Sequence, residues 1–423
     1  RAPPPRNGGG MTSSQRAARG IILGTLRSIR DGELTLVEGG RRLRFGSGVP
    51  KAIVEVRSPR AWPALLRGSR GLARAYMDGL WESPDPAAVI RVAARNVQGL
   101  DELRRRLTPL REPFQRGRAA LHRNTPARSR DDIAAHYDLG HEMFELMLDP
   151  TMMYSCALFE SPQATLEQAS LAKLDLVCDK LDLGPRDHVL EIGTGWGGFA
   201  VHAARTRGCR VTTTTISEAQ REFAAQRVRR AGVADKVELL HRDYRELDGT
   251  YDKLVSIEMI EAVGWKDFGT FFATCSDRLA PHGAMLLQAI TMDDRAYAVE
   301  RASKSFIRSY IFPNGCLPSN EVIARSVAAR TDLRAVHLED LTPHYAQTLR
   351  LWRDNFERGA ARLAELGYDE RFRRLWRMYL SYCEGGFAER RIALIQAVLA
   401  KPRWSGVVPT TRAAGALRTA ATG

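Results

Sequence analysis

Long hydrophobic runs are missing from this sequence of 423 residues. No apolar run approaches the ~18–20 residues that a helix needs to span a bilayer, which argues against an integral membrane protein. The early apolar stretch Ile21–Leu26 is shorter than the ~7–15 residues of a secretory signal, and no small-residue cleavage site follows it. These absences predict a cytoplasmic protein.

Cysteine is scarce and scattered. None of the cysteines belongs to a C-x-x-C pair of the kind found in zinc and redox sites, so we expect reduced thiols and no bound metal. The six are Cys156, Cys178, Cys209, Cys275, Cys316 and Cys383.

Acidic residues are scarce only in the first third of the chain. Residues 1–130 contain 26 Lys and Arg against 10 Asp and Glu, whereas the remaining 293 residues contain 37 against 39. The positive charge peaks between Arg104 and Arg130, with few aromatic residues among the arginines. Because each cation near an anionic lipid surface contributes ~1 kcal/mol, docking on the inner face of the cell membrane is one interpretation of this segment, which the charge alone does not select. Nucleic-acid binding and a merely solvated surface are the alternatives.

The length exceeds the ~100–200 residues of one ordinary domain and predicts two. The Pro- and Gly-rich residues 1–10 are expected to be a disordered extension ahead of Met11. We expect a basic lipid-docking domain over residues 11–123, a linker over 124–130, a larger domain over 131–408 and a flexible tail over 409–423.

Two patterns of secondary structure follow. In the smaller domain, strands at 33–37 and 41–45 flank a Gly-Gly turn, a third strand lies at 52–56, and helices follow at 61–68, 71–76 and 86–97, which predicts an α+β fold. In the larger domain, helices at 131–148 and 165–181 precede strands at 189–192, 210–215, 237–241, 251–257 and 284–290, with helices at 197–207, 218–231 and 265–279 between them. This alternation predicts an α/β fold with a doubly wound, mostly parallel sheet. Residues 301–400 are expected to be mainly helical.

A glycine-rich segment follows the first of these strands: Val189-Leu-Glu-Ile-Gly-Thr-Gly-Trp-Gly-Gly198. Such glycines allow a sharp turn and close approach to a ligand, and the following helix N-terminus offers free N–H donors. Dinucleotide binding would need an acidic residue ~20 positions further on, yet residues 212–217 contain none. Instead Glu191 precedes the glycines and Asp243 ends the third strand, a layout that resembles class I methyltransferases. A helix N-cap is the alternative role for Asp243.

Several segments, in order over residues 131–400, resemble the cyclopropane-fatty-acyl-phospholipid synthase family, which includes mycolic acid cyclopropane synthases. The basic domain is also similar to the extra domain of phospholipid-acting members. The matching segments are His136–Gly140, Met153–Ala157, Glu191–Gly198, Thr215–Gln220, Glu258–Gly264, Tyr310–Ser319 and Tyr379–Cys383.

The resemblance implies a methyl transfer from S-adenosylmethionine to a cis double bond of a phospholipid acyl chain. The cofactor would be bound by Tyr154, Ser155, Glu191, Gly193, Thr194, Gly195, Trp196, Gly197, Thr215, Ile216, Ser217, Gln220, Asp243 and Tyr244. Methylation of an alkene leaves a carbocation, which aromatic faces stabilise. The aromatic candidates are Tyr154, Trp196, Phe306, Tyr310 and Phe312.

The carbocation must lose a proton before the cyclopropane ring closes, so the reaction requires a base. The family uses bound bicarbonate, which here would be held by Cys156, Glu261, Gln288, Tyr345 and the backbone of Ile290. Gln288 departs from the family, where His is frequent, and an amide cannot titrate. Cys383 matches a cysteine once regarded as a nucleophile; the chemistry needs none, and we favour a structural role.

Three other functions stay open at this stage. Methylene or methyl branching would follow if the same cation underwent a hydride shift before losing its proton. A nucleic-acid methyltransferase would explain the basic domain, but the sequence lacks the aromatic residues of RNA-stacking modules. A non-catalytic lipid-binding protein is the third alternative. A homodimer is left open as the assembly.

Overall fold

The computed structural model describes residues 11–96, 140–303 and 305–410. These residues form a small four-stranded module at the N-terminal end and a larger domain built on a seven-stranded sheet. The arginine-rich peak at 104–130, the linker at 124–130, most of the His136–Gly140 motif and the tail at 411–423 lie outside the described residues.

The N-terminal module contains the predicted hairpin, formed by its first two strands. Its sheet has the order β2-β1-β3-β4, in which β1 pairs with β2 antiparallel and with β3 parallel. Leu34 and Leu36 alternate on the buried face of β1, and Leu36 packs against Trp62. The elements are α1 (Ser13–Leu26), β1 (Gly32–Glu38), β2 (Arg41–Ser47), β3 (Lys51–Val56), α2 (Ala61–Leu65), α3 (Gly68–Met77) and β4 (Trp81–Glu82), and residues 86–96 are helical.

The larger domain has the predicted doubly wound sheet, with the order β10-β11-β9-β8-β5-β6-β7. The strands β9, β8, β5, β6 and β7 run parallel to one another. β11 runs antiparallel to both of its neighbours, β9 and β10. Its elements up to β9 are α6 (His141–Met147), α7 (Leu166–Lys180), β5 (His188–Ile192), α8 (Gly198–Thr206), β6 (Arg210–Thr214), α9 (Glu218–Arg230), β7 (Val237–Leu240), η1 (Tyr244–Glu246), β8 (Tyr251–Ile257), η2 (Ile260–Ala262), α10 (Phe268–Arg278) and β9 (Leu279–Met292).

Residues 301–400 are mainly helical, as expected, but they also supply two strands that the sequence did not predict. β11 is an apolar run buried along most of its length, and periodicity alone does not distinguish such a run from a buried helix. The elements are α11 (Tyr297–Ala302), α12 (Phe306–Tyr310), α13 (Asn320–Arg330), β10 (Arg334–Asp340), α14 (Thr342–Arg358), α15 (Ala360–Glu365), α16 (Glu370–Ala388) and β11 (Ile392–Ala400).

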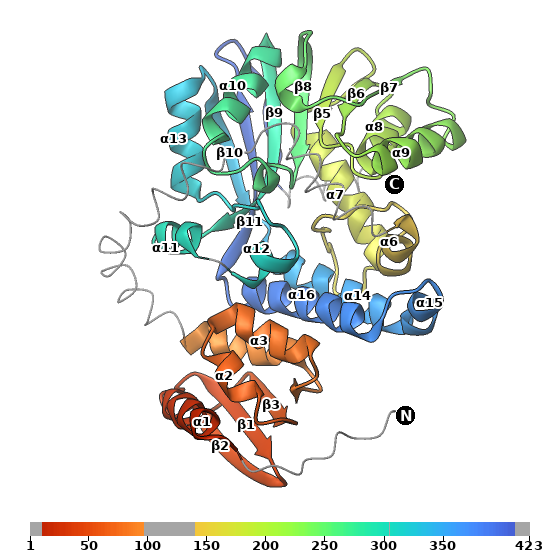
Figure 1. Cartoon of the computed structure of the whole chain (residues 1–423). Helices are drawn as coiled ribbons and strands as arrows, with labels where there is room; N and C mark the ends of the chain where they lie inside the picture. The colour runs from red at the N-terminus through yellow and green to blue at the C-terminus, as the bar shows by residue number, and fades with distance from the viewer. Residues whose placement is uncertain (1–10, 97–139, 304, 411–423) are drawn as a thin grey trace.

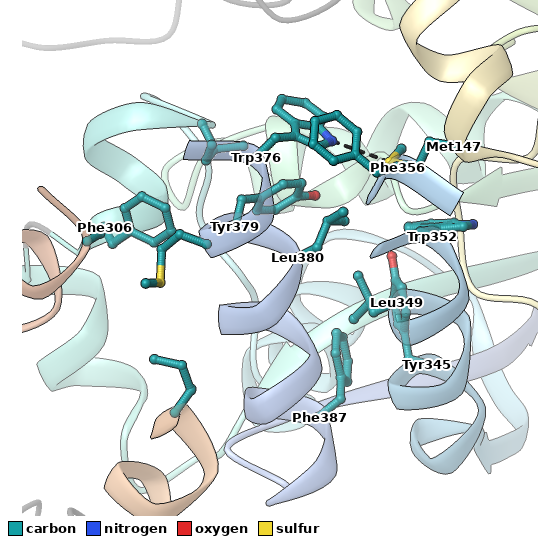
Figure 2. Close-up of a cluster of buried hydrophobic side chains, with 14 of the residues drawn as sticks. Met147, Phe306, Tyr345, Leu349, Trp352, Phe356, Trp376, Tyr379, Leu380 and Phe387 are labelled. Carbon is teal, nitrogen blue, oxygen red and sulfur yellow. Dashed lines mark hydrogen bonds between the residues drawn. The ribbon is translucent and has the colours of Figure 1, made fainter. Parts of the chain in front are cut away.

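Helices α14 and α16 lie between the seven-stranded sheet and the N-terminal module (Figure 1). Large aromatic side chains pack where these helices meet, including Trp352 on α14 and Trp376 on α16 (Figure 2). Tyr345 and Tyr379 come from the same two helices and stand beside this cluster (Figure 2). The two helices therefore form an aromatic wall beside the candidate active site.

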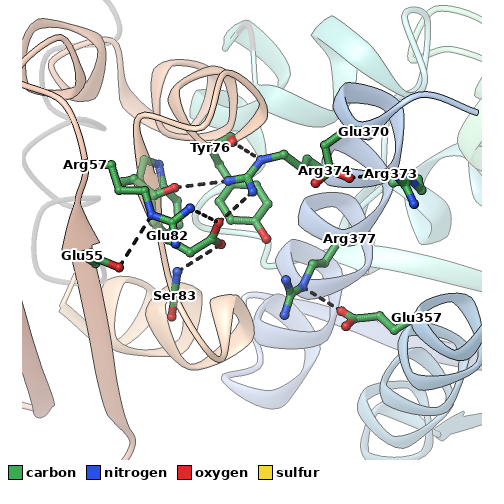
Figure 3. A network of polar contacts seen from close by, with 11 residues as sticks. Glu55, Arg57, Tyr76, Glu82, Ser83, Glu357, Glu370, Arg373, Arg374 and Arg377 are labelled. Carbon is green, nitrogen blue, oxygen red and sulfur yellow. Dashed lines mark hydrogen bonds and ion pairs between the residues drawn. The ribbon is translucent and has the colours of Figure 1, made fainter. Parts of the chain in front are cut away.

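The N-terminal module is joined to α16 by buried polar contacts (Figure 3). The Arg374 guanidinium donates to the Tyr76 carbonyl at 2.6 Å and to the Glu82 carboxylate at 2.7 Å, and it lies 4.2 Å from the centre of the Tyr76 ring. Glu389 accepts from Arg91 and Arg95 at the other end of the helix. These contacts hold the module in a defined position against the larger domain.

Candidate active site

One large cavity, with a volume of about 1240 Å³, connects the two parts of the protein. Its walls include the glycine loop after β5, the carboxylates after β8 and the aromatic side chains of α14 and α16. The N-terminal module contributes an apolar wall that includes Leu26, Leu34, Val54, Trp62 and Val89. Such a cavity is suited to a polar cofactor and a long apolar substrate together.

The glycine loop has the backbone that the sequence predicts. Gly193, Gly195 and Gly197 have positive φ angles of 104°, 52° and 83°, in the region that favours glycine. At Gly198 a Cβ atom would lie 2.8 Å from the Thr151 carbonyl oxygen as well as 2.4 Å from the Met153 sulfur, so the close backbone approach favours glycine there. The loop therefore brings the N-terminus of α8 close to the cavity, as a nucleotide-like ligand requires.

Most of the expected cofactor residues share this cavity. Twelve of the fourteen line it; the other two are Gly197, which begins α8, and Ser217, which caps α9. The buried Glu191 carboxyl accepts from the Thr213 hydroxyl at 2.6 Å, and burial raises its pKa to about 8. Asp243 caps η1 and accepts from the Arg245 guanidinium at 2.7 and 2.8 Å. The N-cap alternative for Asp243 is thus part of its role.

Glu258 follows β8 and has a left-handed φ of 52°. Its carboxylate accepts from the Cys156 backbone N–H at 2.9 Å, from the Gln288 amide at 2.8 Å and from the Tyr345 hydroxyl. The three donors come from the 148–160 loop, β9 and α14, so three separate segments meet at one carboxylate. Burial raises the pKa of Glu258, while its hydrogen bonds and the nearby Lys173 lower it.

Glu261 lies in η2 and has fewer partners. One carboxyl oxygen accepts from the Ile290 backbone N–H at 2.6 Å, and the other is buried without a hydrogen-bond partner among the described residues. Burial and the Glu258 charge raise its pKa to about 8. Two adjacent buried carboxyls do not both ionise readily. Glu258 accepts three hydrogen bonds and Glu261 one, so the arrangement favours the charge on Glu258 and the proton on Glu261.

The residues expected to surround the base meet at a different carboxyl. Cys156, Gln288 and Tyr345 do come together, but around Glu258 rather than around an anion held by Glu261. Only the Ile290 backbone N–H contacts Glu261 as expected. The sequence does contain a signal for Glu258, because it directly follows a parallel strand, where ligands bind.

The two candidate cysteines have neutral thiols. Burial raises the pKa of the Cys156 thiol well above its ordinary value, and the thiol donates to the Ala157 carbonyl at 3.2 Å. The backbone N–H of Cys156, rather than its sulfur, therefore contacts the carboxylate. Cys383 lines the cavity, and burial raises its pKa to about 12. A nucleophilic thiolate is not favoured at either position.

Lys173 on α7 is a residue that the sequence reading missed. Its buried ammonium donates to the Ser155 hydroxyl at 2.9 Å. Burial lowers its pKa to about 8, while the charges of Glu258 and Glu191 act in the opposite direction. A buried cation between these carboxyls lowers the cost of ionising one of them.

Three of the five aromatic candidates line the cavity: Tyr154, Trp196 and Phe312. The hydroxyls of Tyr154 and Tyr379 share a hydrogen bond of 2.8 Å, which orients both rings. Phe306 and Tyr310 instead pack against each other with ring centres 5.9 Å apart. The sequence therefore predicted the aromatic region of the site, but not which of the aromatic side chains face the cavity.

Comparisons with known proteins identify the family of the chain. The family described as mycolic acid cyclopropane synthetase matches residues 124–397. The tuberculostearic acid methyltransferase UfaA1 of Mycobacterium tuberculosis is 38% identical over 378 residues, covering 85% of this chain and 87% of that protein. The cyclopropane-fatty-acyl-phospholipid synthase of Escherichia coli K12 is 36% identical over 358 residues, covering 84% and 89%.

Solved structures show the same relationship. The cyclopropane synthase MmaA2 of Mycobacterium tuberculosis is 31% identical, with a TM-score of 0.61 over 66% of this chain and all of that chain. The mycolic acid cyclopropane synthase CmaA1, solved with S-adenosylhomocysteine and CTAB, is also 31% identical, with a TM-score of 0.60 over 64% of this chain and 98% of that chain. The chain therefore belongs to the mycolic acid cyclopropane synthetase family and is an S-adenosylmethionine-dependent methyltransferase that acts on lipids.

Proposed function

We propose that this enzyme methylates a cis double bond in the acyl chain of a membrane phospholipid and closes a cyclopropane ring, with the Glu258 carboxylate as the base. The observation that carries the proposal is the set of three hydrogen bonds to Glu258 at the wall of a large, mainly apolar cavity. A carboxylate with this environment is a fixed proton acceptor beside the space that the substrate enters.

The residues present do not fit a bound bicarbonate. Three of the donors expected to hold that anion, on Cys156, Gln288 and Tyr345, are already bonded to Glu258. A second anion there would face two carboxyls with only the Ile290 N–H as a donor, and that N–H already bonds Glu261. We therefore assign the proton transfer to the protein's own carboxylate.

S-adenosylmethionine would supply an electrophilic methyl group when bound at the glycine loop. The double bond must meet this group in a dry, oriented site, and the apolar walls of the cavity exclude water from it. The cation that develops on the acyl chain would face the rings of Tyr154, Trp196 and Phe312. Glu258 would then take a proton from the new methyl carbon, and that C–H electron pair closes the ring.

The shape of the cavity supports a long-chain substrate. Apolar side chains from the N-terminal sheet and from the helix at 86–96 extend the cavity beyond the larger domain. They include Leu34, Leu36, Val54 and Ile90. An acyl chain could thus lie across both parts of the protein with its double bond near Glu258.

The surface of the N-terminal module supports peripheral binding to an anionic membrane. Five of the ten exposed large hydrophobic residues in the described part of the chain belong to residues 11–96: Ile21, Leu43, Val49, Ile53 and Leu66. Exposed arginines on β2 flank Leu43. Among the described residues, no helix is long and apolar enough to cross a bilayer. Apolar contacts with adjacent cations are the features by which proteins bind membrane surfaces.

The test is methyl transfer to defined lipids. Purified enzyme, S-adenosylmethionine with an isotopically labelled methyl group and vesicles of a monounsaturated phospholipid should give labelled acyl chains, detected by mass spectrometry. Vesicles of the saturated lipid are the control. Labelling of saturated chains, or no labelling of unsaturated ones, would contradict the proposal.

Methylene branching is a second candidate, favoured by the similarity to UfaA1. A hydride shift before deprotonation would place the cation on the methyl-bearing carbon, and Glu258 would then remove the same methyl proton to form an exocyclic double bond. The two products have the same mass. Ozone distinguishes them, because it cleaves the exocyclic double bond to a ketone and leaves a cyclopropane intact.

A further inference from the structure

A row of buried polar side chains crosses the sheet from Lys180 to Glu258. Its first member is Lys180, at the end of α7, whose ammonium donates to the Glu339 carboxylate at 2.6 Å and to the Gln396 amide oxygen at 2.7 Å. The Gln396 amide N–H donates to the Gln288 amide oxygen at 2.8 Å. Gln288 in turn donates to Glu258 at 2.8 Å.

Strand register places these groups in one line. Glu339 on β10 pairs with Gln396 on β11, and Gln396 pairs with Gln288 on β9. Directly paired residues have their side chains on the same face of a sheet. Gln288 also pairs with Ile257, and its carbonyl accepts from the Glu258 backbone N–H at 2.8 Å. Gln288 thus holds Glu258 by both its main chain and its side chain.

The two ends of the row determine its direction. An ammonium group only donates hydrogen bonds and a carboxylate only accepts them, whereas an amide can turn either way. Lys180 therefore directs the oxygen of Gln396 toward itself and its NH₂ group toward Gln288. The same constraint passes to Gln288, whose NH₂ group must then face Glu258.

We propose that Lys180 and Gln396 are positioning residues for the methyl-transfer reaction, which keep the Gln288 amide oriented as a donor to the carboxylate of Glu258. The inference rests on the proposed role of Glu258 as the base. The amide row does not conduct protons, because amides do not titrate; it orders two dipoles so that their positive ends point at Glu258. The ionised base is thereby stabilised before the substrate arrives.

The row is buried, which strengthens its effect on Glu258. The side chain of Lys180 has no exposed surface, and Gln288 and Gln396 are fully buried, so water does not screen their dipoles. The titratable groups that face Glu258 are Glu261, Lys173, Tyr345 and Cys156, and those near Lys180 are Glu339 and His337. The two glutamine amides bond each other directly, so a turn of the Gln396 amide reaches Glu258 through Gln288.

The most informative variant is Gln396→Glu. It preserves the shape of the side chain and the contact with Lys180, but a carboxylate cannot donate to the Gln288 oxygen. Gln288 would turn its NH₂ group toward position 396 and its oxygen toward Glu258. We expect kcat to fall about tenfold or more and the acidic limb of the kcat–pH profile to move to higher pH, with KM for lipid and affinity for S-adenosylhomocysteine unchanged.

Two further variants complete the design. Lys180→Met frees both amides to turn without adding a charge, so it should change kcat and the pH profile in the same direction but less. Gln168→Glu is the matched control, because it makes the same exchange in the capping box at the start of α7, away from the cavity, and should leave kcat and the pH profile unchanged. If Gln396→Glu does not fold, Lys180→Met decides the question.

A second measurement separates this proposal from the proposed function. The infrared C=O band of protonated Glu258, identified as the band that Glu258→Gln removes, reports the titration of that carboxyl without any substrate. Failure of the wild-type enzyme to methylate lipids would contradict the proposed function, and the infrared titration would still test the row. The proposal for the polar row would be overturned if the variants fold and Glu258 titrates in them at the same pH as in the wild type. Where activity is measurable, kcat would then also be unchanged.

Discussion

Glu258 combines a strained backbone with a fully engaged side chain. A non-glycine residue in the left-handed region costs of order 1–3 kcal/mol and persists where its surroundings hold it in place. Here the carboxylate is held by donors from three segments and the backbone N–H by Gln288. The strain therefore coincides with the group that faces the substrate cavity.

Exchanging each carboxyl for an amide should distinguish Glu258 from Glu261. Glu258→Gln removes the proton acceptor, and we expect kcat to fall by about 10²–10⁴-fold. Glu261→Gln resembles the protonated acid already present, so the loss should stay below about tenfold. Calorimetry with S-adenosylhomocysteine should show unchanged affinity in both. The reverse ranking of the two variants would assign the base to Glu261.

The pH dependence of kcat follows from the raised pKa of Glu258. Only the ionised carboxylate accepts a proton, so activity should be present above this pKa and lost as the pH falls through it. Because burial raises the pKa, the loss should occur above the value of ~4.3 for an unperturbed glutamate. A profile of kcat measured under saturating substrate checks this. An acidic limb at or below the unperturbed value would contradict the assignment.

The sequence identified the residues around the proposed base better than the proposed base itself. Cys156, Gln288, Ile290 and Tyr345 could be matched to family motifs one by one. The exchange of roles between Glu258 and Glu261 could not, because both follow the same strand and their separation depends on the turn into η2. Which carboxyl gains the donors is decided by side chains that lie far away in the chain.

At the scale of elements, the glycine loop predicts a measurable effect. Gly195 has open space around it, so a larger side chain would act mainly through its left-handed φ, which costs roughly 1–2 kcal/mol for a residue with a Cβ. Gly195→Val should therefore weaken S-adenosylhomocysteine binding by about tenfold in calorimetry.

The matched control for this variant is Gly232→Val. Gly232 also has a positive φ and open space, but it follows α9 and does not line the cavity. Gly232→Val should lower the stability of the protein by about as much as Gly195→Val and leave the affinity for S-adenosylhomocysteine unchanged. Unchanged affinity in Gly195→Val would contradict the assignment of the loop to the cofactor.

The strands that alternate with helices were predictable because each is bounded by turn residues and followed by a periodic helix. β10 and β11 were not predicted; β11 follows the long helical stretch of α14 to α16, and its sequence is apolar on both faces apart from Gln396. Because Gln396 belongs to β11, its position near the candidate site was not predicted either. The polar row to Glu258 becomes visible only when β11 is placed between β9 and β10.

At the scale of the whole molecule, the N-terminal module should bind anionic membrane. Arg41, Arg42 and Arg44 are exposed on β2 beside Leu43, and each contributes ~1 kcal/mol near an anionic surface. Replacing the three arginines with glutamine should lower the affinity for anionic vesicles, measured by co-sedimentation, by up to about a hundredfold. Rising salt should weaken the wild-type interaction in the same way. Equal binding to zwitterionic and anionic vesicles at low salt would exclude the electrostatic contribution.

The central claim is that the protein supplies its own base, and bicarbonate dependence tests it most directly. Methyl transfer would be measured in decarbonated buffer and after adding bicarbonate, for the wild type and for Glu258→Gly. Glycine tolerates the left-handed backbone and leaves the donors of Cys156, Gln288 and Tyr345 open to an anion. The wild type should be equally active in both buffers, whereas Glu258→Gly should be inactive without bicarbonate and regain activity with it. A wild-type rate that falls on decarbonation and recovers with bicarbonate would contradict the account.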